Sequence, residues 1–177
     1  MLDIDTQGLW IFGYGSLIWK PNFPFIQKKP AILTGWVRRF YQASPDHRGT
    51  KVCPGRVVTL LPDPTEKCYG MAYQIANTHR EKVLNYLDIR EQKGYSLLTE
   101  QIVLLGVGSV PALVYIAATD NPHYIGPESP KDIAAQITKC TGPSGSNLEY
   151  FLQLRTALQK FSPSEKHLDD IFQHLHQ

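Results

Sequence analysis

Residues 56–75 read RVVTLLPDPTEKCYGMAYQI, and the expected fold class depends most on this segment. Its two ends, residues 56–61 and 68–75, are rich in β-branched and aromatic side chains and predict strands. The prolines and aspartate at 62–64 predict a turn between them. Because one strand follows the other without a helix in between, the segment argues against a regularly alternating, doubly wound parallel sheet.

Outward from this segment, the chain continues with strands on both sides and with a loop before it. Further strands are predicted at residues 9–12, 31–42, 96–105 and 110–117. Gly35 predicts a bulge or a kink in its strand. Residues 44–55, which contain Pro, Asp, His, Arg and Gly, are expected to form a loop.

Helical patterns interrupt the strands once and then fill the last third of the chain. Residues 78–81 have the spacing of a capping box, and the helix that they begin is expected to end at Gly94. Other helix starts are predicted at residues 129–130, 147 and 162–165. This irregular order of strands and helices favours an α+β fold, in which helices pack on a mixed or closed sheet.

The composition indicates a compact soluble enzyme or binding domain. The chain has 177 residues, of which 42% are hydrophobic, so it can bury a sizeable core, and a single domain over residues 1–177 is expected. Its 18 basic and 16 acidic residues give a net charge of +2. That balance argues against a basic nucleic-acid-binding tail and against a disordered acidic one.

The uncharged residues 101–118 are long enough to raise the question of a membrane span. Gly106, Gly108 and Pro111 interrupt them, so two strands joined by a tight turn are the better explanation. Residues 1–7 lack the pattern of a secretory signal. We therefore expect a cytoplasmic protein without nucleic-acid or membrane partners.

Cys53, Cys68 and Cys140 are an odd number of cysteines at wide spacing, without a C-x-x-C motif. We expect three reduced thiols, as is usual in cytosolic proteins. The histidines near the end of the chain, His167 among them, have no carboxylate at metal-ligand spacing, so no metal site is expected.

Residues 13–17, Gly-Tyr-Gly-Ser-Leu, form the first candidate site. Their spacing differs from that of a nucleophile elbow, a dinucleotide-binding fingerprint and a P-loop. What remains is a strand that runs into two glycines and a serine, where backbone N–H groups can converge on an anion. An ordinary tight turn explains the same residues, and the sequence leaves both interpretations open.

Residues 86–95, YLDIREQKGY, form the second candidate site. On a helix Asp88 and Glu91 share a face, and this like charge, the helix dipole and any burial all raise a carboxylate pKa. A facing Arg90 or Lys93 opposes that shift. The other interpretation is a solvated, salt-bridged helix end.

Weaker candidates lie elsewhere in the chain. His47 is a loop histidine that could orient a ligand or simply be exposed, and residues 142–145 form an expected interhelix loop whose backbone could line a pocket. Arg38, Arg39 and Arg56 could bind a carboxylate or serve as fold-stabilising partners.

Taken together, the two candidate sites resemble a known family. Residues 12–19 (FGYGSLIW) followed by residues 88–95 (DIREQKGY) closely resemble the ChaC family of glutathione-specific γ-glutamylcyclotransferases. Further matching segments are residues 46–49 (DHRG), 54–60 (PGRVVTL), 120–122 (DNP), 124–127 (YIGP) and 142–145 (GPSG). Gln92 departs slightly from the family pattern, in which lysine is common.

The resemblance implies a small mixed β-barrel with peripheral helices, and cleavage of glutathione into 5-oxoproline and cysteinylglycine without a cofactor or metal. By position, Glu91 matches the catalytic glutamate. The matches to the substrate-binding loop are Phe12, Gly13, Tyr14, Gly15, Ser16 and Leu17. In such a reaction the substrate's own α-amine is the nucleophile, which fits a sequence without nucleophile motifs and leaves Glu91 to act as the base.

Two other functions stay open from the sequence. A cyclotransferase for other γ-glutamyl amino acids or amines would use the same glutamyl-binding motifs. A non-catalytic regulator of cation transport is the alternative of a different class, although the sequence has no polybasic segment and no exposed amphipathic stretch for membrane association.

Overall fold

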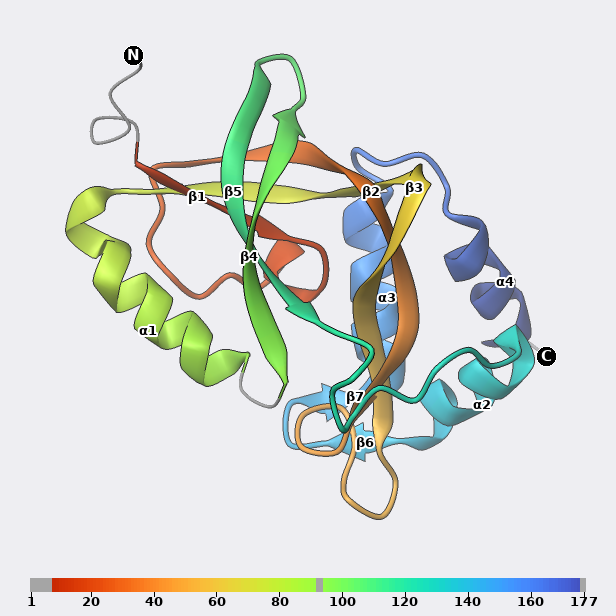
Figure 1. The fold of residues 1–177 in the computed structure, drawn as a ribbon. Helices are drawn as coiled ribbons and strands as arrows, with labels where there is room; N and C mark the ends of the chain where they lie inside the picture. The colour runs from red at the N-terminus through yellow and green to blue at the C-terminus, as the bar shows by residue number, and fades with distance from the viewer. Residues whose placement is uncertain (1–7, 92–93, 176–177) are drawn as a thin grey trace.

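The computed structural model describes residues 8–91 and 94–175 as a closed five-stranded barrel surrounded by helices (Figure 1). The barrel strands are β1 (Leu9–Gly13), β2 (Gln27–Ser44), β3 (Gly55–Ile75), β4 (Tyr95–Leu104) and β5 (Gly108–Ala117). They lie in the order β1-β3-β2-β4-β5, and β1 closes the barrel by pairing in parallel with β5. The other barrel pairings are antiparallel, so the predicted α+β class with a small mixed barrel is confirmed.

The helices lie on two sides of the barrel (Figure 1). They are α1 (Arg80–Arg90), α2 (Pro130–Lys139), α3 (Asn147–Leu158) and α4 (Lys166–Leu175), with short 3-10 turns η1 (Ser16–Ile18) and η2 (Asn77–His79). Helix α1 lies on one side, and α2, α3 and α4 gather on the other, where a two-stranded hairpin, β6 (Thr141–Gly142) and β7 (Gly145–Ser146), joins α2 to α3.

The predicted turn at residues 62–64 does not separate two strands, because β3 is continuous from Gly55 to Ile75. Opposite this point the register shifts: Thr34 pairs with Lys67, whereas Trp36 pairs with Pro62. The extra residues of β3 therefore bulge outward, where a proline without an N–H is tolerated. The same shift confirms the irregularity predicted at Gly35.

The helix starts were predicted with mixed success. Ser129 accepts a hydrogen bond from the N–H of Asp132 at the start of α2, and Ser146 caps α3 in the same way, with Asn147 as the first residue of the helix. The predicted capping box at residues 78–81 is wrong: η2 occupies its first half, and α1 starts at Arg80 without a side-chain cap.

The barrel interior and the helix-facing side of the sheet form one apolar core. Strand β4 shows the expected alternation, since Ile102 and Leu104 are buried while Gln101 and Val103 are exposed. Other fully buried side chains are Ile11, Phe12, Leu33, Phe40, Leu60, Tyr73, Ile75, Leu87 and Phe151. The uncharged residues 101–118 form most of the β4–β5 hairpin, as predicted, and no helix in the described part of the chain is long and apolar enough to cross a membrane.

Two of the arginines left open by the sequence are structural. Arg38 is buried, donates to Cys68 Sγ at 3.1 Å and to the carbonyl of Tyr69, and lies 3.5 Å from the Glu165 carboxylate. The equally buried Arg56 donates to the carbonyl of Phe40 at 2.9 Å and pairs with side chains around α2. Both therefore hold the fold together rather than bind a substrate.

The expectation of three reduced thiols is wrong, because Cys53 and Cys140 form a disulfide. The two Cα atoms lie 5.7 Å apart although the residues are separated by 87 positions, a proximity that spacing in the sequence does not reveal. A cross-link of this kind typically contributes about 2–4 kcal/mol, mainly by restricting the unfolded chain. Cys68 is free and buried, and burial raises the pKa of its thiol to about 11.

His167 makes the stability of the fold depend on pH. Its Nε2 accepts a hydrogen bond from the N–H of Phe40 at 3.0 Å, which requires the neutral ring, and burial lowers its pKa to about 4. Because the unfolded value is about 6.5, the folded chain binds fewer protons, so this contribution is complete above pH 6.5 and is lost as the pH falls toward 4. We expect His167→Gln to remove about 2 kcal/mol of the difference between the unfolding free energies at pH 7.5 and pH 4.5. Urea unfolding at both pH values measures this; an identical pH dependence in the two proteins would contradict it.

Candidate active site

A pocket of about 590 Å³ lies where segments far apart in the sequence meet. All seven residues matched to the site of the family line it: Phe12, Gly13, Tyr14, Gly15, Ser16, Leu17 and Glu91. Its volume is typical of small-molecule sites. The fold thus brings the two candidate sites of the sequence into one cavity.

The glycine loop (residues 12–17) follows from the end of β1. Gly13 ends the strand, and a Cβ at this position would lie 2.6 Å from Leu17 Cβ, so the turn into η1 requires glycine. Tyr14 fastens the loop to β5 by donating a hydrogen bond to the carbonyl of Tyr115 at 2.7 Å. The two interpretations of this motif are therefore compatible, since a tight turn forms part of the pocket lining.

Arg90 connects the glycine loop to the end of α1. Its Nη2 donates to Ser16 Oγ at 2.7 Å, and its Nη1 donates to the carbonyl of Lys20 at 2.8 Å and to the hydroxyl of Tyr86 at 3.0 Å. Its Nε lies 3.8 Å from Glu91 Oε1. One guanidinium thus joins the serine of the first motif to the carboxylate of the second.

Glu91 is the residue that caps the C-terminal end of α1, where its N–H donates to the carbonyl of Leu87 at 2.7 Å. Its side chain is only 17% exposed, so it is not part of a solvated helix end. Burial raises the pKa of the Glu91 carboxyl, and the charge of Arg90 opposes part of that increase. The group is therefore a carboxylate that accepts a proton more readily than an exposed one does.

The predicted direction of this pKa shift is confirmed, but one predicted cause is wrong. Asp88 was expected to share a face with Glu91 and to raise its pKa. Instead Asp88 is exposed and accepts a hydrogen bond from the hydroxyl of Tyr115 at 2.7 Å, because Glu91 has already left the helix. Lys93 and Gln92 lie outside the described residues.

Tyrosines surround the carboxylate. Burial raises the pKa of Tyr14 and of Tyr95 well above the ordinary value, and the charge of Glu91 raises both further. Burial also raises the pKa of Tyr150 to about 12, although the nearby N–H of Val58 opposes the shift. Phenols with such pKa values stay protonated at neutral pH. The hydroxyl of Tyr14 already donates to the carbonyl of Tyr115, whereas those of Tyr95 and Tyr150 can donate hydrogen bonds in the pocket.

A second side of the pocket is lined by residues 45–48 and by Ser144. We call the two segments to which they belong, residues 45–54 and the β6–β7 hairpin (141–146), the distal wall. The ring of His47 and Oγ of Ser144 lie 3.3 Å apart, and both residues line the pocket. Arg48 also lines it and donates to the carbonyl of Ser146 at 3.2 Å. Both weaker candidates, His47 and residues 142–145, are thus located beside the main site.

Several lining residues were not singled out from the sequence. They are Lys20, Asn22, Gln42, Ala43, Tyr115, His123 and Tyr150. Most belong to strands or helices, where hydrophobic periodicity does not distinguish a side chain that faces a pocket from one that faces the core. Neither Tyr115 nor Tyr150 belongs to a motif found in the sequence, so no signal there marked them as lining residues.

Among residues 8–91 and 94–175, no group of three or more His, Cys, Asp or Glu side chains could hold a metal ion. The predicted absence of a metal and of a cofactor from the reaction stays a prediction.

Comparisons with known proteins agree on one family. A family model described as ChaC-like protein matches residues 9–177. Glutathione-specific gamma-glutamylcyclotransferase 1 of Danio rerio is 42% identical over 161 residues, which span 89% of this chain and 82% of that protein. The Homo sapiens protein of the same name is 41% identical over 172 residues, or 94% of this chain and 78% of that protein. The crystal structure of the yeast γ-glutamylcyclotransferase specific to glutathione matches with a TM-score of 0.85 at 32% identity, covering 97% of this chain and 98% of that one.

Proposed function

Because the chain belongs to the ChaC-like family, we propose that it is a glutathione-specific γ-glutamylcyclotransferase that releases 5-oxoproline and cysteinylglycine. The observation that carries the proposal is the position of Glu91. Its buried carboxylate, with a raised pKa, lies in the same pocket as the glycine loop, and Arg90 connects the two. Relatives named for this activity that are 41–42% identical over most of their length support the choice of substrate.

The reaction needs a base and a held substrate, and no nucleophile from the protein. The α-amine of the glutamyl residue attacks the γ-carbonyl, the new C–N bond closes a five-membered lactam, and the old amide bond breaks. Glu91 takes a proton from the α-ammonium, which is mostly protonated at neutral pH. The attacking nitrogen gives up two protons in all as the lactam forms, and Glu91 passes them to the departing nitrogen, which leaves as an ammonium group. No water is consumed, and the proton count is unchanged.

Positioning is expected to contribute more than proton transfer. Acid–base help of this kind gives about 10²–10⁴-fold, whereas well-oriented intramolecular reactions reach effective molarities of about 10⁵–10⁸ M. In our proposal backbone N–H groups of the glycine loop hold the α-carboxylate, which brings the α-amine near Glu91. The protonated phenols of Tyr95 and Tyr150 can donate hydrogen bonds to the oxygen of the γ-carbonyl as negative charge develops on it.

The direct test is incubation of the purified chain with reduced glutathione, followed by mass spectrometry for 5-oxoproline and cysteinylglycine. γ-Glutamylalanine at the same concentration is the comparison substrate. Turnover of glutathione well above that of γ-glutamylalanine supports the proposal. The opposite preference favours a cyclotransferase for other γ-glutamyl compounds, and no turnover of either favours the regulator. A cytoplasmic location and the absence of nucleic-acid and membrane partners stay predictions.

Ser16→Ala should weaken substrate binding without abolishing the chemistry. The variant loses the hydroxyl that accepts a hydrogen bond from Arg90, and so loosens the glycine loop. Hydrogen bonds to charged groups contribute about 1.5–3 kcal/mol, so we expect KM to rise about tenfold while kcat changes little. Steady-state kinetics measure this, with Ser109→Ala, in a strand outside the pocket, as the control. A covalent acyl adduct on Ser16 would show instead that the serine is a nucleophile.

A further inference from the structure

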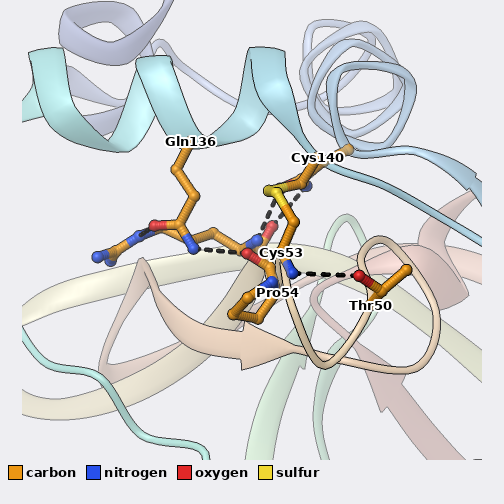
Figure 2. Close-up of a disulfide and its surroundings, with 7 residues drawn as sticks. Thr50, Cys53, Pro54, Gln136 and Cys140 are labelled. Carbon is orange, nitrogen blue, oxygen red and sulfur yellow. Dashed lines mark hydrogen bonds between the residues drawn. A yellow bond between two sulfur atoms is a disulfide. The ribbon is translucent and has the colours of Figure 1, made fainter.

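The disulfide joins the two segments of the distal wall (Figure 2). Cys53 lies in the β2–β3 loop, five residues after Arg48, and Cys140 immediately precedes the β6–β7 hairpin that carries Ser144. Around the bond, Gln136 Nε2 donates to the carbonyl of Pro54 at 2.7 Å. The bond thus connects the two segments of the distal wall near the residues that line the pocket, His47, Arg48 and Ser144.

The two segments also pack backbone against backbone. The N–H of Ser144 donates to the carbonyl of His47 at 2.9 Å. A Cβ on Gly142 would lie 2.3 Å from that same oxygen and 2.5 Å from the nitrogen of Gly49. The backbones of the two segments are therefore in contact, with no space for a side chain at this position. A change in the separation of the two segments therefore moves His47, which lines the pocket.

The two cysteine residues are not equally exposed. Cys140 is 2% exposed, whereas Cys53 is partly exposed in its loop. This difference favours Cys53 Sγ over Cys140 Sγ as the atom that an incoming thiolate attacks, with Cys140 as the leaving group. Because Cys140 follows the last residue of α2, the negative end of the helix dipole disfavours its thiolate, and the released group takes up a proton.

We propose that Cys53 is a site of reversible modification by a small thiol of the glutathione class, and that this modification opens the distal wall. In the first step the thiolate attacks Cys53 Sγ, a new S–S bond forms, the Cys53–Cys140 bond breaks, and Cys140 leaves as a thiolate that is protonated by water. In the second step another small thiolate attacks the sulfur of the bound small thiol. The small-molecule disulfide departs and Cys53 becomes a thiol, so the protein gains two electrons and two small thiols lose them.

The consequence for the pocket is selective. Glu91 and the glycine loop belong to α1, β1 and η1, and Arg90 holds them together, so opening the distal wall leaves them in place. Binding of the substrate at the distal wall weakens instead. We expect KM for glutathione to rise about threefold or more while kcat stays about constant, the pattern of lost uniform binding. The modification itself does not depend on the proposed function; only its effect on turnover does.

Mass spectrometry of the full chain tests the modification. The Glu91→Gln protein, oxidised beforehand, is equilibrated at neutral pH with reduced and oxidised glutathione in varied ratios, and free thiols are then blocked with N-ethylmaleimide. We expect a species with one glutathionyl group on Cys53 and a blocked Cys140, replaced by a doubly blocked species in the most reducing buffers. Buried Cys68 stays unblocked and reports that the chain is folded. An intact disulfide under all ratios, or an adduct on Cys140 instead of Cys53, would overturn the proposal.

Kinetics test the effect on the pocket. Initial rates are compared for the oxidised chain, the same chain reduced with dithiothreitol, and the Cys53→Ser/Cys140→Ser chain, with Cys68→Ser as the matched control that keeps the disulfide. The reduced and double-variant chains should share the raised KM, and dithiothreitol should not affect the double variant. Equal KM values for the oxidised and reduced wild-type chains would show that the modification does not affect the pocket. This comparison uses only the wild-type chain, so it holds even if the double variant fails to fold. A complete lack of turnover by the oxidised chain contradicts the proposed function and leaves the mass measurement as the test of the modification.

Discussion

Glu91→Gln is expected to lower the rate of 5-oxoproline release by about 10²–10⁴-fold, the usual contribution of a positioned acid–base group. The amide has nearly the same shape as the carboxylate but cannot take a proton from the α-ammonium. Because the glycine loop and the distal wall are unchanged, glutathione should still bind. The measurements are single-turnover rates by mass spectrometry and binding by calorimetry.

The matched control is Glu81→Gln, an exposed carboxylate in the first turn of the same helix, which should leave the rate unchanged. The pH profile adds a second criterion. Burial raises the pKa of Glu91, so the acid limb of kcat/KM should fall at a pH above the ordinary carboxyl value, and this limb should be absent in the Gln variant. Near-normal turnover by Glu91→Gln would remove this carboxylate from the mechanism.

Asn147→Ala is expected to lower the free energy of unfolding by about 2–6 kcal/mol, because it leaves two buried backbone groups unpaired at about 1–3 kcal/mol each. Asn147 is fully buried at the start of α3. Its Oδ1 accepts the N–H of Arg56 at 2.6 Å, and its Nδ2 donates to the carbonyl of the same residue at 2.7 Å. The Asn147 side chain thus connects the backbone of β3 to the start of α3. Urea unfolding of the wild-type and Asn147→Ala proteins measures how much these two hydrogen bonds contribute to stability.

Asn147→Asp provides a second test of the same contact. The carboxylate keeps the acceptor, loses the donor, and places a negative charge against the carbonyl oxygen of Arg56, so it should destabilise the fold at least as much as alanine does. Gln153→Ala is the control on the same helix, where an exposed amide contacts Glu149 and its loss should cost about 0.5 kcal/mol or less. A change below that limit in Asn147→Ala would contradict the prediction.

The fold could be predicted from the sequence where local patterns and tertiary structure agree. The strands around Leu33 and Val114 and the caps of α2 and α3 have local causes, namely alternation and serine side chains. The turn predicted at Pro62 is wrong, because this segment forms a bulge within β3. Strand β2 pairs with β3 on both sides of that bulge. The register between distant strands decided that outcome, and no local window contains it.

The site was predictable to the extent that its residues are contiguous. The glycine loop and Glu91 each stand in a short motif, and the resemblance joined them. The disulfide and the lining residues Tyr115 and Tyr150 come from separate elements, so their proximity depends on how the barrel closes. The influence of Asp88 on Glu91 was predicted from helical spacing, which ceases to apply where the helix ends.

Closure of the barrel by its first strand also determines when during synthesis the pocket can exist. β1 is made first, yet its partners β3 and β5 are both made later, and residue Ile11 pairs with Leu113. A nascent chain that has left the ribosome only as far as Glu91, just after α1, already contains the loop and the carboxylate, but it has no β5 to complete the wall and no α3. The apolar segment Leu9–Gly13 stays unpaired on its β5 side throughout this interval. The complete pocket can therefore form only after β5, which closes the barrel, and α3 have emerged.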